Sequence, residues 1–267
     1  MKLVAHCLVC NEENFIWYAI QSVIGLVDQV IVWDTGSSDQ TCQIIENIQN
    51  SKIKFAQKGQ ADARRLSNLR QEMLERTSAD WIWILDGDEI WTQQGLSEVK
   101  NIIENYSDKY FLMVHRAKTL VGDVYHYLGE DSGRYRIAHA QGHLNIRLIN
   151  TKIAGLHVAG DYPNEAYQDK NGLAIQNFPP DQIYFATVPY FHASFLKRSS
   201  VDWQAGKRKI RYELGNELAK DDLPEVFWQP IPGFIPGPPK SRSWEFIAKS
   251  ILAAPARFIK GQIGKIR

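Results

Sequence analysis

Short apolar runs alternate with polar turns and amphipathic stretches over the first 90 residues of the chain. Because residues 81–85 are apolar without interruption, they predict a strand that is buried on both faces of a sheet. The other predicted strands lie at residues 3–9, 30–33 and 53–56. Helices are predicted between the strands, at residues 11–25 with Asn11 as the N-cap, from residue 40 through Ile48, and at residues 61–78. This alternation predicts an α/β fold with a doubly wound, mostly parallel sheet.

The pattern is weaker after residue 92. Residues 110–114 and 145–149 predict two further strands, and the polar stretch 122–143 between them predicts a loop. A charged helix is expected over residues 203–220, with Lys207, Arg208, Lys209 and Arg211. We expect one main domain over residues 1–229, divided into halves 1–92 and 93–229.

The C-terminal part has a different composition. Five prolines in residues 230–239 predict a linker. In the basic, amphipathic tail 240–267, apolar residues recur at helical spacing and the pattern is interrupted at Pro255, which predicts two short helices. Such a tail either lies on a membrane surface or packs on the domain.

Composition narrows the function. A formal net charge of +1 over 267 residues gives no general attraction to nucleic acid, so we expect no nucleic-acid partner. No leader pattern and no long apolar run are present, so a cytoplasmic protein is expected, either free or on the cytosolic face of a membrane. Cys7 and Cys10 are predicted to be buried structural thiols on opposite faces of a strand, rather than a redox or zinc pair.

Carboxylates cluster where the predicted strands end. Asp86, Asp88 and Glu89 follow residues 81–85, and Gly87 allows a sharp turn between the aspartates. Asp34 ends the second strand, and the ends of parallel strands meet at one edge of a sheet, where ligands bind. Like charges this close repel by roughly 4 kcal/mol at 4 Å, so they stay solvated or hold a cation such as Mg²⁺ or Mn²⁺. The sequence therefore predicts a nucleotide-diphosphate pocket, with a solvated acidic turn as the alternative.

Three ordered segments carry a family resemblance: residues 7–13, residues 33–41, and residues 80–89. Together they resemble the successive motifs of family 2 glycosyltransferases, which have the GT-A fold. The resemblance implies a nucleotide-sugar donor, with Asp-x-Asp binding a divalent ion, Mn²⁺ or Mg²⁺, on the diphosphate. It implies nucleotide contacts from the backbone at Val9 and from Glu12, Asp34, Asp39, Arg70 and Asp86, and metal contacts from Asp86, Asp88 and His192.

An inverting transfer needs a carboxylate base to take the proton of the acceptor hydroxyl. Glu165 and Asp161 are the candidates, because they lie where relatives carry His-Glu, although Asn164 replaces the histidine here. His192 is either a metal or diphosphate contact or a histidine packed beside aromatic residues. His126, His139 and His143 have a loose metal-like spacing, and surface or hydrogen-bonded histidines are the favoured reading.

The sequence thus predicts a metal-dependent, inverting glycosyltransferase of hexosyltransferase type, acting in polysaccharide or glycolipid biosynthesis. The expected partners are a nucleotide-sugar donor, a sugar or lipid-linked acceptor, and a membrane surface at the tail. A nucleotidyltransferase on a similar fold would share the metal site but would release pyrophosphate. A non-catalytic sugar-nucleotide binding module would bind donor without turnover.

Overall fold

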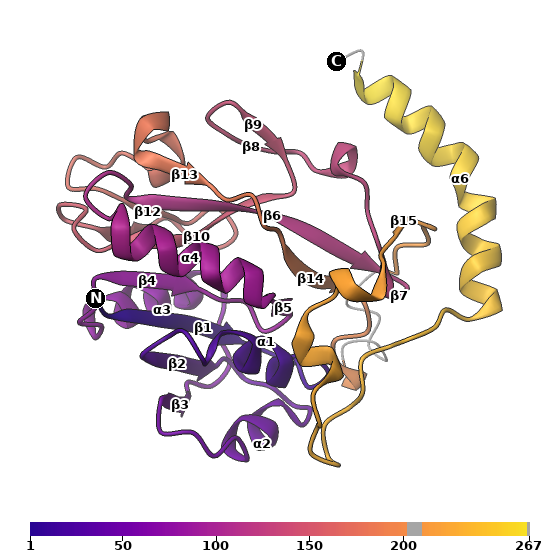
Figure 1. The fold of residues 1–267 in the computed structure, drawn as a ribbon, viewed down its shortest axis with the longest axis horizontal. Helices are drawn as coiled ribbons and strands as arrows, with labels where there is room; N and C mark the ends of the chain where they lie inside the picture. Colours follow the sequence, from indigo (N-terminus) through magenta and orange to yellow (C-terminus); the bar gives the residue numbers. More distant parts are fainter. Residues whose placement is uncertain (202–209, 266–267) are drawn as a thin grey trace.

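In the computed structural model, the chain folds around one mixed sheet (Figure 1). The structure describes residues 1–201 and 210–265. Within these residues the sheet has 11 strands, and its main path runs β15-β7-β6-β10-β4-β1-β2-β3. The strands of this path are β1 (Leu3–Val9), β2 (Gln29–Asp34), β3 (Ile53–Gln57), β4 (Trp81–Ile84), β6 (Leu112–Val121), β7 (Asp123–Tyr127), β10 (Leu144–Asn150) and β15 (Asn216–Glu217).

Other strands join β6 or form hairpins. Off the main path lie β5 (Glu89–Ile90), β13 (Ile183–Phe185) and β14 (Tyr190–Phe195), and two small sheets pair β8 (Tyr135–Ile137) with β9 (Ala140–Gly142) and β11 (His157–Ala159) with β12 (Ala166–Gln168). The α-helices are α1 (Ile16–Val23), α2 (Thr41–Glu46), α3 (Ala63–Glu75), α4 (Gln93–Asn105) and α6 (Trp244–Lys265). Single 3₁₀ turns are η1 (Glu130–Ser132), η2 (Ile175–Asn177), η3 (Pro180–Gln182), η4 (Lys220–Asp222) and η5 (Glu225–Trp228).

The first half of the chain is the parallel unit that the alternation predicts. β4, β1, β2 and β3 are parallel neighbours, so their carboxyl ends lie at one edge of the sheet. The next strand on the path, β10, is antiparallel to β4, with Leu148 opposite Trp83. The α/β prediction with a parallel core is therefore confirmed, and the complete sheet is mixed.

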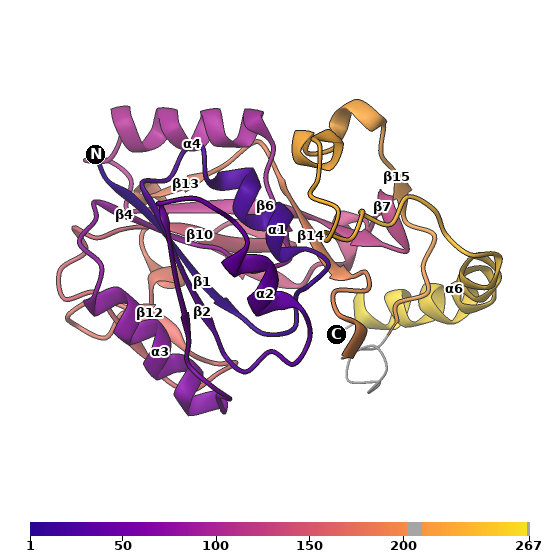
Figure 2. The same ribbon diagram turned by 90° about the horizontal axis from the view of Figure 1, so that it is seen from below.

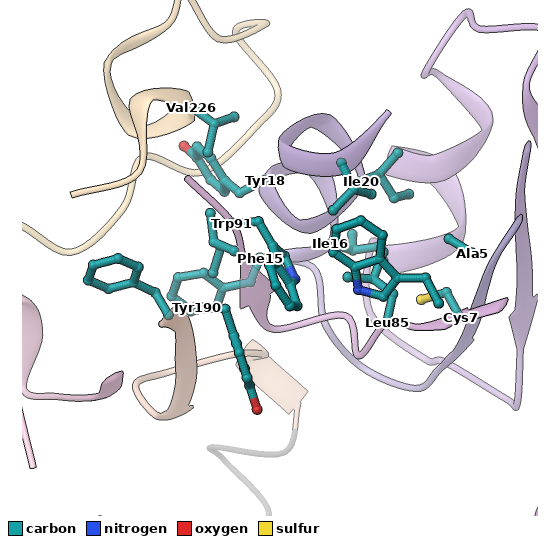
Figure 3. Close-up of a cluster of buried hydrophobic side chains, with 14 of the residues drawn as sticks. Ala5, Cys7, Phe15, Ile16, Tyr18, Ile20, Leu85, Trp91, Tyr190 and Val226 are labelled. Atoms are coloured by element: carbon teal, nitrogen blue, oxygen red, sulfur yellow. The ribbon is translucent and has the colours of Figure 1, made fainter. Parts of the chain in front are cut away.

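Helices cover both faces of the parallel strands (Figure 2). Trp81, Trp83 and Leu85 point into the larger core with α1 and α4, whereas Ile82 and Ile84 point into a second core on the other face. All five are at most 6% exposed, as expected for a strand buried on both sides. Figure 3 shows Leu85 in the larger core near Ile16 of α1, with Trp91 close by.

The first helix begins later than predicted. α1 starts at Ile16 after Phe15, and no side chain caps it. Asn11 instead has a positive φ of 55°, and its side-chain oxygen accepts a hydrogen bond from the backbone N–H of Ser38 at 2.9 Å. Asn11 therefore ties the end of β1 to the turn after β2, because an asparagine tolerates the left-handed conformation that this bend requires.

The polar stretch 122–143 is not one loop. It contains β7, which pairs with β6, and the β8–β9 hairpin. Of the charged helix expected over 203–220, residues 203–209 lie outside the described residues, and residues 210–219 are not helical. Gly215 has a φ of +66°, and β15 follows it and pairs with β7. A right-handed helix does not continue through such a φ value.

The C-terminal part is attached to the domain at several points. In the proline-rich segment, the carbonyl of Pro236 accepts a hydrogen bond from the Tyr18 hydroxyl at 2.9 Å, and that of Pro239 accepts one from Val124 N–H at 3.0 Å. The prediction of two helices is wrong, because α6 continues through Pro255. A proline removes one backbone donor, and a helix can resume beyond it. No helix within the described residues is long and apolar enough to cross a membrane.

Candidate functional site

A cavity of about 290 Å³ lies at the carboxyl edge of the parallel strands. Its walls come from the ends of β1 and β4, from α3, and from the segment after β14. Of the residues that the sequence predicted for a site, those lining this cavity are Val9, Glu12, Arg70, Asp86, Asp88 and His192. The structure thus brings together six positions that are spread over more than 180 residues of the chain.

Asp88 lies at the centre of a charged cluster. Its side chain is 2% exposed, and His192 Nε2 lies 3.3 Å from its Oδ1. Arg198 contacts Asp88 Oδ2 and also Glu12 Oε1, the latter at 3.0 Å. His192 reaches this place because β14 pairs antiparallel with β5, which follows the Asp86-Gly87-Asp88 turn. Arg198 therefore contacts carboxyl groups that follow two neighbouring strands, β1 and β4.

The charges within this cluster shift one another's pKa values. Burial alone would raise the pKa of Asp88, but the positive charges of Arg198 and His192 hold it below its usual range. Burial and the neighbouring charge of Asp88 raise the pKa of Glu12. Burial would lower the pKa of His192, but the carboxylate of Asp88 outweighs it and raises that pKa. The arrangement keeps Asp88 ionised and pairs it with Arg198 and His192.

A second charged network joins Asp86 of the cavity lining to two residues that do not line the cavity, Arg147 and Glu89. Arg147, on β10, donates to Asp86 Oδ2 at 2.9 Å and contacts the buried carboxylate of Glu89. Burial would raise the pKa of Asp86, but Arg147 and Arg70 outweigh it and lower that pKa. Burial raises the pKa of Glu89 to about 8, despite the contact with Arg147. Arg147 therefore fixes the position of the Asp86 carboxylate from underneath.

Asp34 and Asp39 hold the turn after β2. Asp34 Oδ1 accepts hydrogen bonds from the backbone N–H groups of Gly36 at 2.9 Å and Ser37 at 3.0 Å. Asp39 Oδ1 accepts one from Thr41 N–H at 2.9 Å, at the start of α2. Neither residue lines the cavity, although Thr35 of the same turn does. The structure therefore gives each aspartate a role in the backbone conformation of the segment after β2.

Glu165 lies beside Arg70 rather than in the lining itself. Arg70 Nε is 3.3 Å from Glu165 Oε1, and the Glu165 side chain is 12% exposed. The other oxygen, Oε2, is buried and has no hydrogen-bond partner among the described residues. Asp161 is exposed in the preceding turn, next to Tyr162, which does line the cavity. Of the two predicted base candidates, Glu165 is thus the one held by a residue of the cavity wall.

The cysteines and histidines considered in the sequence analysis lie in different surroundings. Cys7 is buried as expected, but Cys10 is exposed and lines the cavity, because β1 ends at Val9 and the chain leaves the sheet there. His126 and His143 hydrogen-bond to Asp123 and Ser132, respectively, which confirms the hydrogen-bonded reading. His139 packs beside Phe185.

Few side chains of the cavity could coordinate a metal ion. In the part of the chain that the structure describes, no group of three or more His, Cys, Asp or Glu side chains is placed to hold a metal ion. In the cavity, Asp88 Oδ1 and His192 Nε2 lie 3.3 Å apart. This pair fits Mg²⁺ or Mn²⁺ in the mode where few protein ligands are completed by waters and substrate phosphates.

Sequence reasoning missed two site residues. Arg198 lies 110 positions after Asp88, and the chain around it carries no pattern that marks a charged partner. Arg147 was assigned only to a strand, although an arginine inside an apolar strand was a usable sign of a buried carboxylate partner, since a buried charge needs one.

Comparisons with known proteins bear on this geometry. Residues 8–158 match the family Glycosyl transferase family 2. Comparison with curated proteins gave no match. Among solved structures, S. aureus TarS 1–349 in complex with UDP-GlcNAc aligns with a TM-score of 0.50 and 14% identity, covering 72% of this chain and 58% of TarS 1–349. Glucosyl-3-phosphoglycerate synthase from Mycobacterium tuberculosis, in complex with Mn²⁺ and UDP-glucose, aligns with a TM-score of 0.45 and 16% identity, covering 69% and 68%.

The structural likeness concerns the fold. At 14% identity, TarS supports a GT-A-like architecture, and the chain spans less than two thirds of the TarS chain that it matches. The family match covers more than half of the 267 residues and includes β1, the turn after β2, and the Asp86-Gly87-Asp88 turn. On this match, the chain belongs to glycosyl transferase family 2.

Proposed function

We propose that this chain transfers a hexosyl group from a nucleotide-diphosphate donor to an acceptor hydroxyl, with inversion and with the help of a divalent metal ion. The observation that carries the proposal is the cavity at the carboxyl edge of the sheet. There an ionised Asp88, with His192 and Arg198, lies in the same wall as Arg70, which holds Glu165. The family match supports a sugar-nucleotide donor.

The nucleotide would lie over the ends of β1 and β2. Backbone groups at Val9, the carboxylate of Glu12 and the turn held by Asp34 and Asp39 border this part of the edge. A carboxylate there accepts hydrogen bonds from ribose hydroxyls or from the N–H of a base. Arg70 and Asp86 would face the sugar-diphosphate, because both line the cavity on the side of β4.

Asp88 and His192 would hold the metal ion, preferably Mn²⁺ or Mg²⁺. When bound, the ion would neutralise the diphosphate as it leaves. Arg198 lines the cavity beside Asp88, so its guanidinium would also meet phosphate oxygens of a bound donor. His192 must be neutral to act as a ligand, and its raised pKa therefore favours metal binding at alkaline rather than acidic pH.

Glu165 is the proposed base. The acceptor oxygen forms a bond to the anomeric carbon, the bond from that carbon to the diphosphate oxygen breaks, and the acceptor proton passes to the carboxylate. One oxygen of Glu165 is held by Arg70, and the buried Oε2 has no hydrogen-bond partner among the described residues. Arg70 would therefore orient the carboxylate through one oxygen, and the other oxygen, buried in this structure, would take the proton once the acceptor has displaced what covers it.

The test begins with donor identification. Nucleoside diphosphates and sugar nucleotides are screened by thermal shift with Mn²⁺ and with a chelator, since a ligand at 100 times its Kd adds about 2.7 kcal/mol of stability. The donor found is then incubated with sugar and lipid-linked acceptors, and the released product is identified. Nucleoside diphosphate is expected. Release of pyrophosphate would instead identify a nucleotidyltransferase, and donor binding without turnover would leave a binding module.

Glu165→Gln tests the base. Transfer should fall by about 10²- to 10⁴-fold, while donor affinity stays nearly unchanged, because the base acts on the acceptor in the transition state. Asp161→Asn is the matched control, since it removes a carboxylate from the exposed turn nearby and should leave turnover close to the original. Near-normal transfer by Glu165→Gln, with transfer lost in Asp161→Asn, would move the role to Asp161.

A further inference from the structure

Helix α6 exposes an apolar stripe. Trp244, Ile251 and Leu252 are 86%, 56% and 80% exposed, and Ala248 between them is exposed as well. Positions separated by four, seven and eight residues share one face of a helix. In Figures 1 and 2, α6 lies at the margin of the molecule, away from the N-terminus. No described residue covers this stripe.

The opposite face of α6 is fixed to the domain. Just before the helix, Arg242 donates to the carbonyl of Val121 at 2.9 Å and lies 3.6 Å from Asp123. Phe246 packs against the ring of Tyr212 with 5.5 Å between centroids, and Ser250, one turn further, is buried. The first turns of α6 are therefore docked, and this docking holds the apolar stripe outward.

The sequence of the same C-terminal segment is strongly basic. The whole chain has 31 basic and 30 acidic residues, yet residues 240–267 contain seven basic residues and only Glu245 as an acid, so the rest of the chain is net negative. Trp228, which is 37% exposed, lies near the start of this segment with Lys220 Nζ 4.7 Å and Lys240 Nζ 5.2 Å from its ring centroid. Exposed tryptophan flanked by lysine is typical of a side chain at a membrane interface.

We propose that α6 docks the protein on an anionic lipid surface, with Trp244, Ile251 and Leu252 entering the boundary between headgroups and acyl chains. Basic residues of the tail would then lie near lipid phosphates. A second copy of the chain fits less well, because three side chains supply well under the roughly 800 Å² that each partner of a stable interface buries. The proposal does not depend on the proposed transfer reaction.

The experiment measures co-sedimentation of the full chain with vesicles. Vesicles of phosphatidylcholine with about one third phosphatidylserine are compared with pure phosphatidylcholine, at about 0.1 M and 1 M salt, where the screening length falls from roughly 10 to 3 Å. Binding to the anionic vesicles is expected to be stronger and to weaken in high salt. The tail is not deleted, because Arg242 bonds to the end of β6 and Pro239 bonds to β7.

The test variant is Trp244→Ser/Ile251→Ser/Leu252→Ser, which changes only exposed positions and should keep the circular dichroism spectrum. Its vesicle affinity is expected to fall at least about tenfold, because apolar insertion supplies much of such binding. Tyr135→Ser/Leu173→Ser is the matched control, since it removes exposed apolar residues elsewhere, and its binding should be unchanged. Unchanged binding by the α6 variant would overturn the proposal. So would a wild-type dimer in sedimentation velocity that the α6 variant loses, which would assign the stripe to a second copy.

Discussion

Arg147→Met should destabilise the protein strongly, because it removes the cation that faces two carboxylates. The Arg147 side chain is 8% exposed, Glu89 is fully buried, and Asp86 is 36% exposed. Breaking a buried pair by removing one partner costs about 3–5 kcal/mol. Because the pKa of Glu89 is about 8, Glu89 is already mostly protonated at pH 7 and stays so in the variant, so the charge left without its partner at pH 7 is that of Asp86, and the loss lies at the lower end of this range. We therefore expect about 3 kcal/mol at pH 7.

The stability lost in Arg147→Met should depend on pH through the pKa of Glu89. Removing Arg147 takes away a positive charge that lowers the pKa of Glu89, so in the variant that pKa rises above 8. A carboxyl group whose pKa is raised in the folded state stabilises that state at low pH. This contribution to stability is lost as the pH rises toward the raised pKa. The native protein stops losing stability near pH 8, whereas the variant continues to lose up to about 1.4 kcal/mol per pH unit above it. The effect of Arg147→Met should therefore be larger at pH 9 than at pH 7.

Urea unfolding followed by tryptophan fluorescence measures both effects, with an unchanged m-value expected. Glu89→Gln in the same background should reduce the cost of Arg147→Met at pH 9, because the carboxyl group that loses its proton there is gone. Lys152→Met is the control. It breaks a pair with Asp108 at the surface just beyond the same strand, and its unfolding midpoint should match that of the native protein. A loss below about 1 kcal/mol for Arg147→Met at both pH values would refute the role of Arg147 as the neutralising cation.

Two further predictions concern Asp88 and His115. Asp88→Asn should weaken metal-dependent donor binding at least about tenfold. It should also lower the free energy of unfolding by roughly 1.5–3 kcal/mol, because the contact with Arg198 is lost. Thermal shift with and without Mn²⁺ measures both effects, and donor binding that stays metal-dependent and undiminished would exclude Asp88 as a ligand. Burial lowers the pKa of His115 to about 3, so between pH 7 and pH 5 the folded state binds no proton at this residue. The unfolded state binds one below about pH 6.5. The contribution of His115 should therefore lower the free energy of unfolding by about 2 kcal/mol from pH 7 to pH 5. His115→Phe, which keeps a ring beside Trp91, should show a flatter melting temperature over this range, and an equally steep decline would contradict the assignment.

The first half of the chain was predictable because its information is local. An apolar run bounded by turn residues predicts a buried strand, and alternation with helices predicts parallel neighbours whose ends meet. From this alone, Asp34 and the segment from Asp86 to Glu89 were predicted at one edge of the sheet, and the cavity there is lined by Asp86, Asp88 and Thr35, which follows Asp34. These residues precede or follow strands directly, so their positions follow from the strands.

The second half was less predictable because its contacts join distant positions. Arg198 meets Asp88 across 110 residues and Arg70 meets Glu165 across 95, and no local pattern selects either pair. The start of α1 was also misplaced, because the Asn11 side chain bonds to the turn after β2 rather than to its own helix. Local propensity predicts what a side chain can cap, whereas the tertiary structure decides which backbone group it reaches.

The place of β4 in the sheet has a consequence for synthesis on the ribosome. β4 lies between β1 and β10, and β10 begins about sixty residues later in the chain. At 5–20 residues per second, one edge of the strand Trp81–Ile84 therefore stays unpaired for roughly 3–12 s after it emerges. An apolar, aromatic strand with an open edge can pair with a neighbouring chain. The nascent protein should therefore depend most on chaperone protection between the emergence of β4 and that of β10.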